Sequence, residues 1–172
     1  KMNAPLNLSL VSREKEIQNL KEKIFINDLI IVSGASGVGK TKLVVEVCKQ
    51  IKNKCDIEVF CVKNNGQLLY NDIRETISDS GSYLIFFDDA NYTMNLVSIF
   101  EFCISKNIDI EINIKFVMTV RDYAKDSIKK LALNKVKFEE IELKPLPFED
   151  IKEIIKKELE VKNEYYLKQI VK

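Results

Sequence analysis

Short apolar runs and helix-period segments alternate along the chain. The apolar runs are rich in β-branched and aromatic residues and predict five β-strands, at residues 28–33, 56–62, 83–87, 113–120 and 136–143. Before and between the first four runs, and again after the fourth, apolar residues recur every third or fourth position, which predicts helices at residues 13–24, 40–52, 67–78, 93–105 and 123–133. Such an alternation is typical of a parallel sheet covered by helices on both faces. We therefore expect an α/β fold with a five-stranded parallel sheet and right-handed crossovers.

The ends of the elements carry their own signals. Residues 83–87, Tyr-Leu-Ile-Phe-Phe, are apolar at every position, which places this strand in the middle of the sheet. Ser12 is suited to cap the first helix, and Pro145 and Pro147 break the last strand. Two further helical patterns follow, at residues 148–158 and 164–172. The second runs to the last residue, so we expect this chain to be a piece of a longer protein.

Residues 34–41 read Gly-Ala-Ser-Gly-Val-Gly-Lys-Thr and match G-x-x-x-x-G-K-[S/T] at every fixed position. Glycines permit the positive φ angles of a concave loop whose N–H groups point at phosphate oxygens, and the following helix N-terminus adds unpaired amides. Lys40 supplies an ammonium for the β- and γ-phosphates, and the Thr41 hydroxyl is suited to ligate Mg²⁺. The residues expected to hold the nucleotide phosphates are Gly34, Ala35, Ser36, Gly37, Val38, Gly39, Lys40, Thr41 and Lys42.

Two carboxylates, Asp88 and Asp89, follow the apolar strand directly. A carboxylate in this position is suited to hold the water shell of Mg²⁺, with Thr41 as a direct ligand of the ion. Asp89 is placed to orient or deprotonate a water that attacks the γ-phosphate. Thr41 and Asp88 are therefore the predicted metal-site residues, and Asp89 is the predicted general base. A solvated turn is the alternative for such a pair.

The strand at residues 113–120 contains Thr119 near its end and is followed by Arg121. A guanidinium at this edge of the sheet lies within reach of a γ-phosphate, and the Thr119 hydroxyl is suited to bind the attacking water. We group Lys40, Asp89, Thr119 and Arg121 as the predicted catalytic residues. A surface ion pair is the alternative for Arg121.

Composition limits the remaining chemistry. The 172 residues are 46% apolar and 31% charged, which suits one soluble domain, and no apolar run approaches the ~20 residues of a membrane span. Lys and Arg (27) balance Asp and Glu (26), so no net field favours nucleic acid or membranes. The chain lacks histidine, which excludes histidine chemistry within it. The cysteines show no C-x-x-C spacing and are predicted to be buried free thiols of a cytoplasmic protein: Cys48, Cys55, Cys61 and Cys103.

Other classes of phosphate-loop protein have signatures that differ from this sequence. A GTPase reads guanine with Asn-Lys-x-Asp after a strand, and the nearest match, at residues 134–137, lacks the aspartate. The Leu-Ser-Gly-Gly-Gln segment of transporter-type ATPases is absent. Kinases of small molecules commonly use an arginine-rich lid, whereas this chain has three arginines in all, Arg13, Arg74 and Arg121. None of these three classes is therefore favoured.

Four segments carry a family resemblance: Arg-Glu-Lys-Glu at 13–16, the loop at 34–41, Phe-Phe-Asp-Asp-Ala-Asn at 86–91 and Thr-Val-Arg-Asp-Tyr at 119–123. Together they resemble the STAND NTPases, signal-transduction ATPases related to AAA+ proteins that include NACHT and apoptotic ATPases. The last two segments look most like bacterial, phage-defence members. The resemblance implies that Arg13 lies beside the base and ribose and that Arg121 senses the γ-phosphate. It also implies a nucleotide-binding domain over residues 1–160, with a lead helix at 12–24, and the start of a helical domain at 161–172.

The function that this resemblance implies is an ATPase core of a bacterial antiphage switch protein. ATP or ADP would bind with Mg²⁺, slow hydrolysis would reset the switch, and the nucleotide state would control self-association. The sensed ligand and the effector would lie outside this chain. One alternative is a nucleotide-dependent scaffold with negligible turnover. Another is an AAA+-type ATPase acting on nucleic acid, which requires a basic face and is disfavoured by the balanced charge.

Overall fold

The computed structural model describes residues 12–62, 69–77, 80–107 and 112–158. The expected lead-in before residue 12, the helix at 164–172 and the domain beginning at 161 lie outside these ranges. All five strands pair in parallel in one sheet, in the order β2-β3-β4-β1-β5. The strands are β1 (Leu29–Gly34), β2 (Glu58–Val62), β3 (Gly81–Phe87), β4 (Ile112–Arg121) and β5 (Phe138–Glu142). The predicted five-stranded parallel α/β fold is confirmed.

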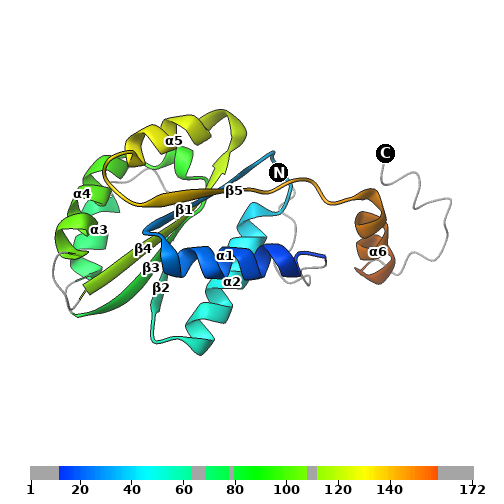
Figure 1. Ribbon diagram of the computed structural model, residues 1–172, viewed down its shortest axis with the longest axis horizontal. Helices are drawn as coiled ribbons and strands as arrows, with labels where there is room; N and C mark the ends of the chain where they lie inside the picture. Colours follow the sequence, from blue (N-terminus) through cyan, green and yellow to red (C-terminus); the bar gives the residue numbers. More distant parts are fainter. Residues whose placement is uncertain (1–11, 63–68, 78–79, 108–111, 159–172) are drawn as a thin grey trace.

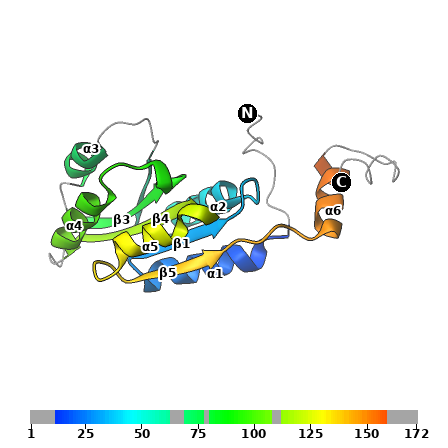
Figure 2. The same cartoon turned by 90° about the horizontal axis from the view of Figure 1, so that it is seen from above.

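Helices cover both faces of the sheet, as Figures 1 and 2 show. Helices α1 and α2 pack on one face, and α3, α4 and α5 pack on the other. The helices are α1 (Glu14–Ile26), α2 (Lys40–Lys54), α3 (Leu69–Thr76), α4 (Leu96–Asn107), α5 (Lys125–Ala132) and α6 (Phe148–Glu158). Two 3₁₀ turns, η1 (Ala90–Tyr92) and η2 (Asp122–Ala124), follow β3 and β4. Among the described residues, no helix has the length and hydropathy needed to cross a bilayer.

The middle strands are buried on both faces. Along β1, Ile30 and Val32 pack with α1 and α2, whereas Leu29 and Ile31 pack toward α3, α4 and α5. Residues 83–87 of β3 are all buried, as the continuous apolar run predicted. Burial of each large apolar side chain stabilises the fold by about 1.5–3 kcal/mol. The sheet is therefore a rigid platform on which the carboxyl ends of β1, β3 and β4 are held in fixed positions.

The first helix begins differently from the prediction. Its N-cap is Arg13, no side chain caps it, and Ser12 has a positive φ of 60°. The prediction that Ser12 caps this helix is therefore wrong. The physical reason is that the Arg13 side chain turns inward and hydrogen-bonds backbone carbonyls elsewhere in the fold, which fixes the entry of the chain without a side-chain cap.

The four cysteines have different environments. Cys48 and Cys103 are buried, as predicted, and burial raises the pKa of each thiol to about 12, so both are inert at neutral pH. Cys55 is half-buried and Cys61 is exposed. The prediction of burial is wrong for Cys61 because it lies on β2, the outermost strand of the sheet at that edge.

The connection after β5 leaves the sheet. Residues 143–147 have no regular secondary structure and include Pro145 and Pro147. They lead to α6, which Figures 1 and 2 show beyond the end of the sheet and apart from the helices that cover it. The position of α6 is thus set mainly by the path of these five residues.

Candidate nucleotide-binding site

The predicted site residues gather at the carboxyl ends of three adjacent strands. Strand β4 lies between β1, which ends in the phosphate loop, and β3, which ends before Asp88. In the β1–β4 pairing, Gly34 is opposite Arg121. Ligands of open parallel sheets bind at this edge. The structure therefore brings together the loop, the acidic pair and the end of β4, as the sequence predicted.

The loop uses its glycines for their backbone freedom. Gly34, Gly37 and Gly39 have φ values of 147°, 84° and 96°, a range in which a side chain is strained. A Cβ at Gly37 or Gly39 would meet no atom of the described residues within 4 Å, so within this part of the chain the positive φ is what favours glycine there. At Gly34 a Cβ would also lie 2.5 Å from the Leu143 carbonyl oxygen. Gly34 is thus required both for its φ and for close backbone approach.

We predict that Gly34→Ala destabilises the fold more than Gly37→Ala. Both variants place a side chain at positive φ, which costs about 1–2 kcal/mol, but only Gly34→Ala collides with a backbone oxygen and displaces the chain after β5. The expected difference in the free energy of unfolding is about 1–3 kcal/mol. Urea denaturation of the two variants measures it, and equal transition midpoints would contradict the prediction.

Lys40, the first residue of α2, is 7% exposed. Its Nζ donates hydrogen bonds to the carbonyl oxygens of Gly34 and Ala35, each at 2.8 Å. Burial lowers the pKa of the Lys40 ammonium, while the charges of Asp89, Asp122 and Asp88 act in the opposite direction. The backbone carbonyls of the phosphate loop therefore hold the Lys40 ammonium over the loop. The carboxylates that act on its charge are those of Asp88, Asp89 and Asp122. The rest of the predicted set lies close by: Ala35, Ser36 and Gly37 are exposed, and Lys42 is half-buried in the first turn of α2.

A chain of hydrogen bonds joins the loop to the acidic pair across β4. Thr41 Oγ1 donates to Asp88 Oδ1 at 2.8 Å, and Thr119 Oγ1 donates to the same oxygen at 2.6 Å. The Asp89 N–H in turn donates to Thr119 Oγ1 at 2.8 Å. Because Thr119 is fully buried and its hydroxyl both donates and accepts, it positions the two aspartates here. Its predicted contact with the attacking water stays a prediction.

The predicted metal-site residues present oxygen atoms only. The Thr41 hydroxyl and the Asp88 carboxylate lie in hydrogen-bond contact at the strand ends. Hydroxyl and carboxylate oxygens are the ligands that Mg²⁺ prefers. This donor set fits the ion that the sequence predicted.

Asp89 and Arg121 face each other beside this chain of hydrogen bonds. Asp89 occupies the left-handed region with φ 47° and ψ 54°, which is uncommon for a residue with a side chain. Arg121 Nη2 lies 3.5 Å from Asp89 Oδ2, and the two side chains are 29% and 41% exposed. The hydrogen bond to Asp89 and its charge raise the pKa of Arg121, and the guanidinium also lies 5.9 Å from the Tyr92 ring centroid. The candidate base, Asp89, and the candidate phosphate sensor, Arg121, thus form an ion pair with each other.

Two tyrosines that have no predicted role lie at the same edge of the sheet, after β3 and β4. Tyr92 and Tyr123 are 56% and 71% exposed, and their hydroxyl oxygens lie 3.4 Å apart. Asn91 Nδ2 donates to the Tyr123 hydroxyl at 3.2 Å. The available signal was their position, since Tyr92 directly follows the motif that carries the acidic pair and Tyr123 is the last residue of the motif that carries Arg121.

Arg13 is buried, with 5% of its surface exposed. Its Nη1 pairs with Glu16 Oε1 at 2.7 Å. Its Nη2 donates to the carbonyl oxygens of Val38, at 3.2 Å, and Lys144, at 2.7 Å. The structure therefore places the Arg13 guanidinium against the backbone of the phosphate loop. Its predicted contact with the base and ribose stays a prediction.

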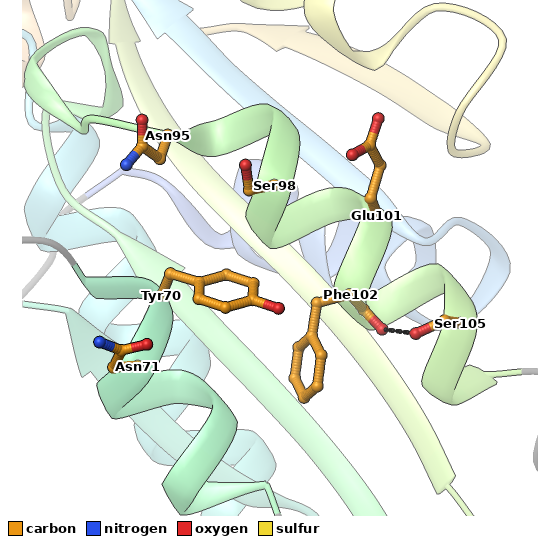
Figure 3. A pocket seen from close by; sticks show the side chains of 7 residues that line it. All are labelled: Tyr70, Asn71, Asn95, Ser98, Glu101, Phe102 and Ser105. Atoms are coloured by element: carbon orange, nitrogen blue, oxygen red, sulfur yellow. Dashed lines mark hydrogen bonds between the residues drawn. The ribbon is translucent and has the colours of Figure 1, made fainter.

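A cavity of about 520 Å³ opens elsewhere, between α3 and α4. Figure 3 shows the side chains that line it, from Tyr70 and Asn71 on α3 to Ser105 on α4. None of the predicted site residues lines it. The site described above is therefore separate from this cavity and lies at the strand ends.

Comparisons with known proteins give information on the fold. No protein-family model matches the chain. A probable disease resistance protein of Arabidopsis thaliana is 31% identical over 85 residues, which cover 48% of this chain and 10% of that protein.

The similar solved structures are P-loop NTPases. The Aeropyrum pernix ORC1 protein in complex with DNA has a TM-score of 0.67 at 12% identity, over 92% of this chain and 52% of its own. A Thermotoga maritima RuvB mutant has a TM-score of 0.63 at 17% identity, over 94% and 57%. Saccharomyces cerevisiae Hsp104 in complex with casein has a TM-score of 0.63 at 18% identity, over 87% and 30%. The chain spans between about a third and three fifths of these neighbours, and its fold is the P-loop NTPase fold.

Proposed function

We propose that this chain is the ATP-binding and hydrolysing core of a STAND-type switch protein. The observation that carries the proposal is the hydrogen-bonded series from Thr41 through Asp88 and Thr119 to Asp89. It connects the start of the phosphate-loop helix to a candidate base that follows β3, two strands away from β1 in the sheet. A glycine turn without a ligand has no need for such a connection.

Each group has a chemical role in this proposal. The loop amides and Lys40 bind the β- and γ-phosphates, and Thr41 and Asp88 hold Mg²⁺, which when bound would neutralise phosphate charge. Asp89 orients the attacking water and accepts its proton. Arg121 forms an ion pair with Asp89 and is suited to leave this partner and bind the γ-phosphate instead.

The switch role goes further. The similarity of half the chain to a disease resistance protein supports a role in defence against infection. We place the protein in the cytoplasm, where its four free thiols would stay reduced. The nucleotide state would govern self-association and an effector outside this chain.

A second candidate is a nucleotide-dependent scaffold with negligible turnover. The pairing of Asp89 with Arg121 favours it, because a carboxylate that is engaged by the guanidinium at 3.5 Å is not free to bind an attacking water. The two candidates share the binding site and differ in whether phosphate is released.

Nucleotide selectivity tests the binding part of the proposal. We expect ATP and ADP to bind with Mg²⁺ and GTP to compete at least about tenfold more weakly, a difference of about 1.4 kcal/mol. A competition titration against a fluorescent ATP analogue, with and without EDTA, measures both effects. Thr41→Val is the matched variant, since it keeps the shape of the side chain and loses the hydroxyl. Equal GTP affinity, or no effect of EDTA on the wild-type protein, would contradict the assignment.

A further inference from the structure

The buried Arg13 guanidinium joins three parts of the chain that are far apart in sequence. Its own position is at the start of α1, Val38 belongs to the phosphate loop, and Lys144 follows β5. One nitrogen, Nη2, donates to both carbonyl oxygens. The loop and the segment after β5 are therefore held by the same atom.

A second contact, independent of Arg13, ties the same two segments together. The Leu143 N–H donates to the Ser33 carbonyl oxygen at 2.8 Å, and the Leu143 carbonyl oxygen approaches the place of a Cβ on Gly34 to 2.5 Å. The backbone of residue 143 thus contacts the start of the phosphate loop. Residue 144 is linked to the other side of the loop, at Val38, through Arg13. The backbone contact lies at the strand end, whereas among the described residues the hydrogen bonds that link residue 144 to the loop at Val38 come from Arg13.

The chemistry of the contact suits this task. A planar guanidinium with five N–H donors in a fixed fork can bridge acceptors that a lysine ammonium cannot hold in the same geometry. Arg13 also has a carboxylate partner in Glu16, so its charge is compensated where it is buried. The bridge is therefore a stable part of the fold.

We propose that Arg13 is a positioning residue that couples the phosphate loop to the connection leading to α6. The inference rests on the proposed function, because a bound phosphate is what would reshape the loop. When the loop closes on a phosphate, the Val38 carbonyl moves, and Arg13 transmits the movement to Lys144 and the proline-containing segment after it. Since α6 lies apart from the sheet, this segment converts a change in the loop into a change in the position of α6.

Amide hydrogen exchange tests the coupling directly. The wild-type chain is measured alone and with Mg²⁺ and ATPγS, and exchange is followed at residues 33–42 and 143–151. We expect the nucleotide to slow exchange at least about fivefold in both segments. In Arg13→Ala the concentration of ATPγS is raised until protection of residues 33–42 is complete, and we then expect residues 143–151 to change less than about twofold. Arg74→Ala, which removes an exposed arginine on α3, is the matched control and should behave as wild type.

Each other result has a definite meaning. Equal slowing of residues 143–151 in Arg13→Ala and wild type, or no slowing there in wild type while the loop is slowed, overturns the coupling. No slowing in either segment of the wild-type chain overturns the nucleotide assignment and the coupling with it. If Arg13→Ala does not fold, Arg13→Lys decides, because it keeps the charge and loses the fork. Loop protection without protection of residues 143–151 in that variant supports the proposal, and protection of both overturns it.

Discussion

Asp89→Asn should slow ATP hydrolysis by about 10²–10⁴-fold, the usual contribution of a positioned general base. The amide keeps the size of the side chain, so the αL turn and the Asp89 N–H bond to Thr119 are retained. It cannot accept the proton of the attacking water. ATP affinity should stay within about twofold because Asp88 and Thr41, which hold the metal in the proposal, are unchanged. Single-turnover phosphate release, with protein in excess over labelled ATP and sampling over hours, measures even slow hydrolysis.

A matched control and a second variant test the role of Asp89 further. Asp126→Asn removes an exposed carboxylate on α5 that pairs weakly with Lys129, and its hydrolysis rate should equal that of wild type. Arg121→Ala separates the base from its partner and should reduce the preference for ATP over ADP. A wild-type rate in Asp89→Asn removes Asp89 from the mechanism. Loss of ATP binding in that variant would make Asp89 a structural or metal-site residue instead.

Lys40→Ala should weaken ATP binding by about tenfold or more, since charge-assisted hydrogen bonds are worth ~1.5–3 kcal/mol each. The structure adds a second expectation. Because Lys40 Nζ also bonds two loop carbonyls, the variant should lose about 1–2 kcal/mol of stability even without nucleotide. Isothermal titration with Mg²⁺-ATP and thermal unfolding of the free protein measure the two effects separately.

Lys49→Ala is the matched control for Lys40→Ala. Lys49 is an exposed lysine on the same helix, so its removal should change neither quantity. ATP affinity within twofold of wild type in Lys40→Ala would show that the phosphate-loop assignment is wrong.

Local patterns were enough to predict most of the fold and the membership of the site. The loop at residues 34–41 has fixed chemistry at fixed spacing, and parallel strands bring their carboxyl ends to one edge whatever the strand order. Asp88 could therefore be assigned to the site because it ends a strand that is apolar on both faces. These inferences require only that the alternation of strands and helices is recognised.

The contacts of Arg13 could not be predicted because they depend on backbone atoms. Nothing in the residue types of Val38 or Lys144 marks their carbonyl oxygens as acceptors, and the contact exists only because β5 pairs beside β1. The error at Ser12 has the same origin, since a tertiary contact of Arg13 fixes the start of α1. Thr119 lies at the edge of the sheet where it was expected, but its partners depend on β4 lying between β1 and β3.

Because β4 lies between β1 and β3, it also sets the distance between the ends of those two strands. Neighbouring strands are about 4.8 Å apart, so the ends of β1 and β3 are separated by about 10 Å. In the proposed function the nucleotide phosphates and their metal ion would lie over this interval, which would be halved if β1 and β3 were paired directly. Thr119, two residues before the end of β4, lies between the two strand ends, and its short side chain is fully buried there. A larger side chain at position 119 would have to displace Asp88, whose Oδ1 lies 2.6 Å from the Thr119 hydroxyl, so the arrangement of the two aspartates depends on a short residue at this position.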